Sequence, residues 1–229
     1  MTQHLLRDLD ILTKKLLALG ELVESLISDA IEALVERKPE LAKQVLASDD
    51  EVDRLEVEIE EDCLKILALH QPVAKDLRYL VAALKVNNDL ERMGDLASNI
   101  ADRAKYLSRK PALGEDLDLR DMAIKVHAMV RDVLKSVVDR DTKLAESVLK
   151  ADDEIDEIHA EMYKNVVQIT KHEPKKMKRA LHFLSASRYL ERIADLATNI
   201  AEDLIFMVTG VVVRHRMEPI PEFEEPNEE

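Results

Sequence analysis

Carboxylate and amide side chains recur in this sequence at a spacing of four residues. They form two matching sets, the first made of Asp49, Asp53, Glu91, Asp95 and Asn99 and the second of Asp152, Asp156, Glu191, Asp195 and Asn199. On an α-helix, residues four apart lie on one face, so each run presents its oxygen atoms together. Ligand sets made only of oxygen suit magnesium, manganese, calcium or iron rather than a thiolate zinc site. The sequence therefore predicts two metal-binding sites of similar composition.

The two sets belong to an internal duplication. Residues 90–101 read LERMGDLASNIA and residues 190–201 read LERIADLATNIA, with nine of twelve positions identical. Upstream, DDEVD at 49–53 is matched by DDEID at 152–156. Repetition on this scale indicates two copies of one structural unit. The repeated apolar residues are explained by helix packing, whereas the repeated acidic and amide residues are not.

The composition favours long helices with an aliphatic core, because the chain has four glycines, 35% charged residues and only 3% aromatic residues. Pro39, Pro72, Pro111 and Pro174 separate segments with helical periodicity. We expect an all-α fold of two tandem three-helix bundles, with six long antiparallel helices over residues 3–37, 40–70, 73–109, 116–140, 143–171 and 175–214. The first bundle should span residues 1–110 and the second 111–215, followed by a disordered acidic tail at 216–229.

This arrangement brings the acidic residues of neighbouring helices to one level. Asp49 and Asp53 lie 22 and 18 residues before Gln71, in the first expected turn, and Glu91 and Asp95 lie 20 and 24 residues after it. With a rise of about 1.5 Å per residue, the two pairs should sit side by side on antiparallel helices. The second half repeats this placement, and Asp29 and Asp132 fall at a similar level on the first and fourth helices.

Two other interpretations of the acidic residues remain open. They could form an ordinary solvated face, as we expect for Glu56, Glu60, Glu61 and Asp62, with Arg54, Arg92 and Arg192 neutralising part of the charge. They could instead belong to a carboxylate-bridged metal-storage or redox protein. A di-iron enzyme of that type uses two Glu-x-x-His motifs, and the nearest match is Asp156-x-x-His159, present once. No nucleophile motif or phosphate loop is found, so we do not expect an enzyme.

The overall charge and the cysteine content indicate the setting of the protein. A net charge of −14 argues against direct binding to nucleic acid. The longest apolar run, residues 204–213, is too short to span a bilayer, and no signal peptide is recognisable at the amino terminus. The single cysteine, Cys63, is expected to be a packed core thiol in a reducing compartment. We therefore expect a soluble cytoplasmic protein.

The doubled motif resembles the PhoU family of regulators associated with bacterial phosphate-specific transport. The resemblance is carried by Leu90-Glu91-Arg92-x-x-Asp95 with Asn99 and by Leu190-Glu191-Arg192-x-x-Asp195 with Asn199. The DDEVD and DDEID segments add the second acidic motif of each half, and the resemblance covers roughly residues 3–215. The apolar pair Val211-Val212 departs from the more polar ending that we expect of this family.

The resemblance implies more than the spacing of the residues does. Members of the family are two three-helix bundles, often dimeric, whose acidic motifs hold metal ions, in some members as multinuclear iron clusters. They restrain phosphate uptake and repress the phosphate-starvation response. The implied partners are the ATPase of the phosphate ABC transporter and the sensor histidine kinase of the response. By this resemblance the protein would be a homodimeric, metal-binding adaptor that uses iron, manganese or magnesium.

Overall fold

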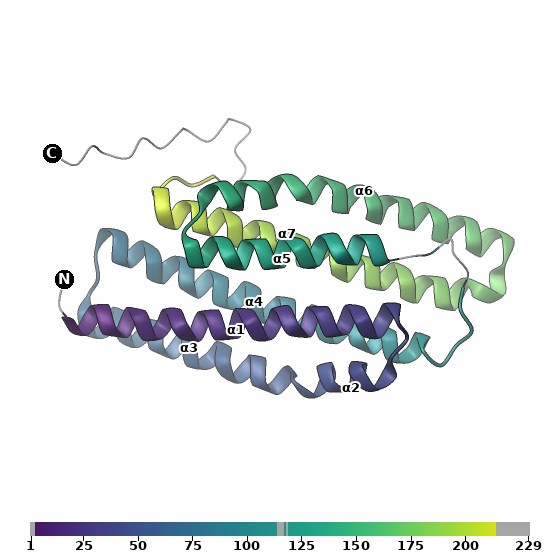
Figure 1. The fold of residues 1–229 in the computed structure, drawn as a ribbon, viewed down its shortest axis with the longest axis horizontal. Helices are drawn as coiled ribbons and strands as arrows, with labels where there is room; N and C mark the ends of the chain where they lie inside the picture. The colour runs from purple at the N-terminus through teal and green to yellow at the C-terminus, as the bar shows by residue number, and fades with distance from the viewer. Residues whose placement is uncertain (1–2, 114–116, 118, 214–229) are drawn as a thin grey trace.

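The computed structural model describes residues 3–113, 117 and 119–213, and all regular structure in these residues is helical (Figure 1). The first half contains α1 (Gln3–Val35), α2 (Pro39–Ala47), α3 (Asp49–His70) and α4 (Ala74–Leu107). The second half contains α5 (Arg120–Asp139), α6 (Thr142–His172), a 3₁₀ turn η1 (Pro174–Lys176) and α7 (Met177–Thr209). The expected all-α architecture of two three-helix repeats is confirmed. The expected tail at 216–229 lies outside the described residues.

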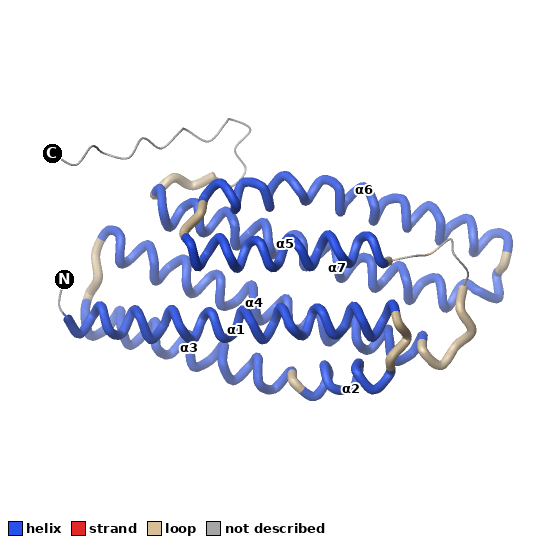
Figure 2. The backbone as a smooth tube through the Cα atoms, in the orientation of Figure 1, coloured by secondary structure: helices blue, strands red, loops and turns tan. Residues whose placement is uncertain are grey.

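The second expected helix is divided into α2 and α3 at Ser48, where Figure 2 shows a short loop. The Ser48 hydroxyl donates a hydrogen bond to the Gln44 carbonyl (3.1 Å). The Ser48 N–H donates to the Val45 carbonyl, three residues earlier, rather than four residues earlier as in a regular α-helix. Serine competes in this way with the helical backbone. The equivalent position in the second half is Ala151, which has no such side chain, and α6 continues through it without a break.

Two helix ends differ from the expected boundaries for local reasons. The fifth helix begins at Arg120 rather than residue 116, and Leu117 and Leu119, which lie before it, are both buried. The last helix begins after η1 and ends at Thr209 rather than 214. Gly210 has a φ of +77°, the left-handed conformation that ends a helix, and its N–H donates to the Phe206 carbonyl (2.8 Å).

The two repeats share one hydrophobic core, because α4 packs against α7 between the outer helices (Figure 1). These helices run antiparallel, so equivalent residues lie on opposite sides of an approximate two-fold axis. Leu90 and its twin Leu190 are both fully buried, as are Ile100 and Ile200. The exposure pattern of residues 90–98 is repeated class by class at 190–198. The duplicated sequence therefore forms duplicated packing.

Gly94 marks the closest approach of α3 to α4. A Cβ atom at this position would lie 3.1 Å from Cγ1 of Val52, which is tighter than ordinary van der Waals contact. The twin position in the second half is Ala194, which is itself fully buried. The difference between glycine and alanine in the repeated motif therefore reflects the packing distance between helices in the first half.

Cys63 is fully buried in the core, in agreement with the expectation of a packed thiol. Burial is the main reason that the pKa of this thiol is raised to about 12, with smaller contributions from Asp62 and Glu60. The thiolate that would react is therefore strongly disfavoured. None of the helices formed by the described residues is both long enough and apolar enough to cross a bilayer.

Leu90→Ala and Leu190→Ala should each lower the free energy of unfolding by about 2–5 kcal/mol, because each leaves a cavity at a fully buried site. Since the core is continuous, both changes should shift the same unfolding transition in a urea titration. Leu64→Ala, at a site that is 55% exposed, is the control and should cost less than about 1 kcal/mol. An unaltered midpoint for either core variant would contradict the shared core.

Candidate functional site

The acidic residues of each half lie on two helices that pack together, α3 with α4 and α6 with α7. We call Asp49, Asp53, Glu91 and Asp95 the first carboxylate cluster, and Asp152, Asp156, Glu191 and Asp195 the second carboxylate cluster. The DDEVD and DDEID segments have the same order of buried and exposed residues. In both halves the apolar residue of the segment, Val52 or Ile155, is buried and anchors the helix. Packing of the apolar residues thus places the carboxylates beside the neighbouring helix.

The first carboxylate cluster is held together across the helix pair. Partial burial raises the pKa of Glu91, and the negative charges of Asp95, Asp53 and Glu56 raise it further. The pKa of Asp95 is raised by burial and by Asp49 and Asp53. Charges on α3 therefore act directly on carboxyl groups of α4, as the matching levels predicted. Asp49 is also fixed by a hydrogen bond from the Ser98 hydroxyl of α4 (2.9 Å).

The second carboxylate cluster contains the largest pKa shift among the acidic residues of the motif. Burial raises the pKa of Asp152 to about 6, with additional contributions, in decreasing order, from Asp195, Asp156, Asp153 and Glu191. Burial and the charge of Asp156 also raise the pKa of Asp195. Since the interacting residues come from both α6 and α7, the structure brings the second predicted set together as well. Keeping these carboxylates charged at neutral pH costs folding free energy.

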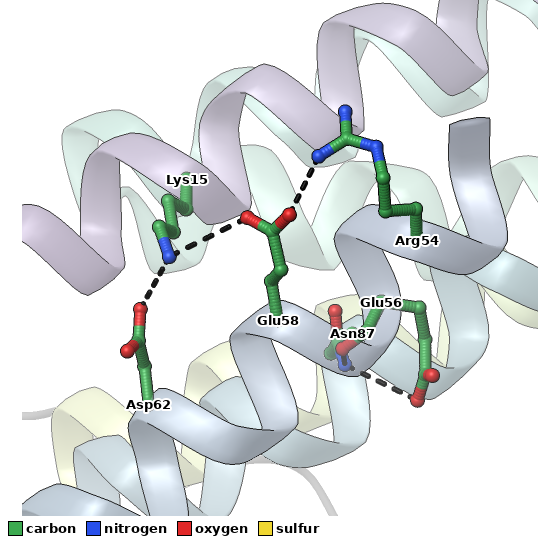
Figure 3. Close-up of polar contacts among 6 residues, drawn as sticks. All are labelled: Lys15, Arg54, Glu56, Glu58, Asp62 and Asn87. Atoms are coloured by element: carbon green, nitrogen blue, oxygen red, sulfur yellow. Dashed lines mark hydrogen bonds and ion pairs between the residues drawn. The ribbon is translucent and has the colours of Figure 1, made fainter.

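The arginines that could neutralise the first carboxylate cluster are directed elsewhere. The guanidinium of Arg54 donates to Glu58 (2.6 Å), one member of a chain of ion pairs that continues through Lys15 to Asp62 (Figure 3). The guanidinium of Arg92 lies 3.5 Å from Asp89 and lowers the pKa of Glu91 less than the carboxylates raise it. The ordinary solvated-face interpretation therefore lacks its neutralising cations here.

An arginine partly neutralises the second carboxylate cluster, and Asp29 and Asp132 interact with other groups than the two clusters. Arg192 lowers the pKa of Asp195, though less than burial and Asp156 raise it. Asp29 is influenced by burial and Glu32, not by the first carboxylate cluster. Asp132 accepts hydrogen bonds from Arg131 (3.1 and 3.0 Å). We therefore leave Asp29 and Asp132 out of both clusters.

The two amide residues of the motif are placed differently from the carboxylates. The Asn99 side-chain amide donates to the backbone carbonyl of Asp95 (2.8 Å), one turn earlier on α4. Asn199 lines a polar groove of about 310 Å³ between the repeats, together with Arg92, Arg192 and Asp195. Asn99 therefore supports the backbone of the first carboxylate cluster, whereas Asn199 faces the seam between α4 and α7.

The sequence analysis did not predict a second repeated contact, which lies one helical turn before Glu91 in the first half and one turn before Glu191 in the second. Asn87 is buried and donates to the backbone carbonyl of Glu56 (2.9 Å), so Glu56 is more than part of a solvated face (Figure 3). At the twin positions, Ser187 is buried and its hydroxyl lies 2.9 Å from Nδ1 of His159. The constant offset between the repeats could have predicted that these positions face each other in both halves. The residue types differ between the halves, so the correspondence is not visible as a sequence repeat.

The donor groups are of the kind that binds a hard metal ion, but their side chains do not converge on a common point. Across residues 3–113, 117 and 119–213, no three Asp, Glu, His or Cys side chains are arranged as they would be around a bound metal. Asp53, Asp95, Asp156 and Asp195 are exposed to solvent and the other carboxylates of the clusters are half-buried, so side-chain rotation is not blocked by packing. Mutual repulsion is what a cation between the helices would relieve.

The fold and these clusters define a class: duplicated helical scaffold proteins with an acidic site in each repeat. The model of the PhoU domain matches residues 16–104 and 119–204. A phosphate-specific transport system accessory protein PhoU homolog of Aquifex aeolicus is 38% identical over 212 residues, covering 93% of this chain and 96% of that protein. A PhoU homolog of Pseudomonas aeruginosa is 37% identical, covering 94% and 89%.

Solved structures agree with the sequence comparisons. The crystal structure of PhoU from Pseudomonas aeruginosa superposes with a TM-score of 0.87 at 36% identity, covering 90% of this chain and 99% of that one. The phosphate transport system regulatory protein PhoU from Streptococcus pneumoniae gives 0.84 at 29% identity, covering 91% and 99%. The chain belongs to the PhoU family. It is a PhoU-like accessory protein of phosphate transport, a regulatory rather than an enzymatic type.

Asp152→Asn should stabilise the metal-free protein at pH 7.5 by roughly 1 kcal/mol, a value reduced for solvent screening of a partly exposed group. The pKa of Asp152 is raised to about 6 in the fold, so its charge destabilises the protein above that pH. Wild type should therefore gain stability as pH falls through 6, and the difference should vanish near pH 4, where the unfolded carboxyl also protonates.

Thermal unfolding between pH 4 and 8 measures this difference. Glu161→Gln removes an exposed carboxylate from the same helix and is the matched control, which should not change the pH profile. Parallel profiles for Asp152→Asn and wild type would show that the repulsion in the second carboxylate cluster is negligible.

Proposed function

We propose that this protein is a metal-binding adaptor that restrains phosphate uptake and represses the phosphate-starvation response. Its partners in this proposal are the ATPase of the phosphate ABC transporter and the sensor histidine kinase of the response. Membership of the PhoU family supports the regulatory role. The observation that carries the metal-binding part is the mutual repulsion of carboxylates across a helix pair, which occurs in both repeats.

Each carboxylate cluster would hold iron, manganese or magnesium ions, singly or as a multinuclear group. Asp49 and Asp53 of α3 would bind together with Glu91 and Asp95 of α4, and the corresponding residues of α6 and α7 would form the second site. A bound cation supplies positive charge that offsets the repulsion and links two helices. The carboxylates would then present a less negative, more rigid surface to a partner, and binding to the folded state would stabilise it.

The metal-binding part predicts two equivalent sites. Glu91→Gln with Asp95→Asn, and separately Glu191→Gln with Asp195→Asn, should each remove about half of the metal bound by wild type. Elemental analysis after reconstitution with Mn²⁺, Mg²⁺ or Fe²⁺ gives the metal content per chain. The exposed pair Glu157→Gln with Glu161→Gln on α6 is the control and should retain full loading. Negligible metal in wild type would show that both clusters are ordinary solvated surface and not metal sites.

The adaptor part predicts that the protein co-purifies with both the transporter ATPase and the sensor kinase from cells grown in abundant phosphate. Neutralising both carboxylate clusters should weaken this recovery about tenfold or more, because the metal-linked surface would be lost. Quantitative affinity purification against the Glu157→Gln/Glu161→Gln control measures the effect. Recovery of neither partner with wild type would refute the adaptor role while leaving the metal content unaffected.

Location and assembly belong to the same proposal. We place the protein in the cytoplasm, where the ATPase and the kinase domain of a sensor would be reached, and as a homodimer. Exposed apolar side chains around the turn between α3 and α4 support self-association, since Leu69 and Val73 are 66% and 74% exposed. The storage or redox alternative instead requires iron oxidation by the purified protein, so an iron-oxidation assay separates the two functions.

A further inference from the structure

The seam between α4 and α7 has two ends that are equivalent in the duplication but differ in their charged residues. Because the helices are antiparallel and the repeat offset is 100 residues in this region, a contact between residues of α4 and α7 has a twin at the other end. One end joins the start of α4 to the end of α7, and the other joins the end of α4 to the start of α7. The two ends can therefore be compared residue by residue.

At the first end a lysine is paired with a buried aspartate. Arg78, the twin of Lys178, also lies at this end beside Gly210, and its Nε is buried without a hydrogen-bond partner among the described residues. The ammonium group of Lys85 donates to the carboxylate of Asp203 (3.0 Å), whose side chain is only 3% exposed. The same ammonium group lies 6.0 Å from the centre of the Phe206 ring. A buried carboxylate and its cation thus form one neutral unit beside an aromatic ring.

At the second end, different residue types occupy the positions equivalent to Lys85, Asp203 and Phe206. Arg103 stands where Asp203 does, Ser185 where Lys85 does, and Tyr106 where Phe206 does. His182 stacks on Tyr106 with ring centres 3.9 Å apart, at a position that is alanine in the twin. Two ammonium groups lie near the Tyr106 ring, those of Lys110 at 5.6 Å and Lys178 at 5.5 Å. We call Arg103, Tyr106, Lys110, Lys178 and His182 the cationic cluster.

The cationic cluster offers donors that lack acceptors within the described part of the chain. Nε of Arg103 is buried and has no hydrogen-bond partner there. Its Nη2 reaches the Tyr189 hydroxyl at 3.5 Å, and its Nη1 lies 3.6 Å from Asp102, a carboxylate that is 58% exposed. Neither Lys110 nor Lys178 pairs with a carboxylate of the residues described. Of the three permanent cations, only Arg103 has a carboxylate within ion-pair distance among the described residues.

Burial and nearby positive charges both act on the pKa of His182. The pKa of His182 is lowered by burial, by Arg103 and by Lys178, and Asp102 offsets this only in part. The ring is therefore held neutral at pH 7 and can still donate one hydrogen bond. Such a surplus of positive charge is unusual in a chain whose net charge is −14.

We propose that the cationic cluster binds a multiply charged oxyanion, either inorganic phosphate or the phosphoryl group of a small organic phosphate, across the seam between the repeats. A guanidinium fork, two ammonium groups and the N–H of a neutral imidazole supply donors, which suit the acceptor oxygens of a phosphoryl group. The ligand would join the end of α4 to the start of α7. The inference rests on the proposed function for its biological meaning, since it would let the regulator respond to phosphate itself.

The test follows the His182 resonance by NMR in the full chain labelled with ¹³C-histidine, kept metal-free by a chelator and at constant ionic strength. His182→Gln identifies the resonance. Inorganic phosphate should shift it in a saturable way and raise the pKa of His182, because an anion favours the imidazolium form. Parallel titrations with glycerol phosphate and with sulfate show whether a phosphate ester or any divalent oxyanion occupies the site.

Lys110→Gln with Lys178→Gln should weaken phosphate binding at least about tenfold. Lys135→Gln with Lys164→Gln removes the same charge from exposed positions on α5 and α6, and should leave the affinity unchanged. A His182 resonance that does not respond to phosphate, or an equal loss in both double variants, would overturn the site. Because the isolated protein is used without metal or partners, either result leaves the adaptor proposal standing.

Discussion

Close packing of α4 against α7 is the constraint on which the rest of the structure depends. Both helices carry the duplicated segment, and its buried residues, Leu90 and Leu190 among them, join the two repeats into one core. If the repeats were separated, the third helix of each unit would expose apolar residues that are now buried at this contact. The remaining helices cover the outer faces of this central pair, and their acidic residues are carried to the surface beside it.

The same packing forces the carboxylates together. Val52 and Ile155 must be buried for α3 and α6 to dock, and the neighbouring aspartates are then held against Glu91 and Glu191 whatever their charges. The raised pKa values measure an electrostatic cost that hydrophobic burial overcomes. Stability and site geometry therefore have different sources in this protein, which is why the clusters can be neutralised by substitution without removing the fold.

Periodicity and the internal repeat were sufficient to predict the helical class, the two bundles and the pairing of the acidic segments. They were insufficient where a single side chain decides the outcome. The break at Ser48 depends on one hydroxyl bonding to Gln44, and α5 starts only at Arg120, after the buried residues Leu117 and Leu119. Glu56 looked like solvated surface because its partner Asn87, which donates to both its backbone carbonyl and its carboxylate, lies on another helix and is not marked by the pattern of acidic side chains.

The break at Ser48 makes the two carboxylate clusters chemically unequal. It makes Asp49 the first residue of α3, whereas Asp152 lies within the continuous helix α6. Burial, followed by the charges of neighbouring carboxylates, raises the pKa of Asp152 to about 6, so a proton competes for its carboxyl group near that pH. If the second carboxylate cluster binds a cation as proposed, acidification towards pH 6 would protonate Asp152 and weaken binding at that site.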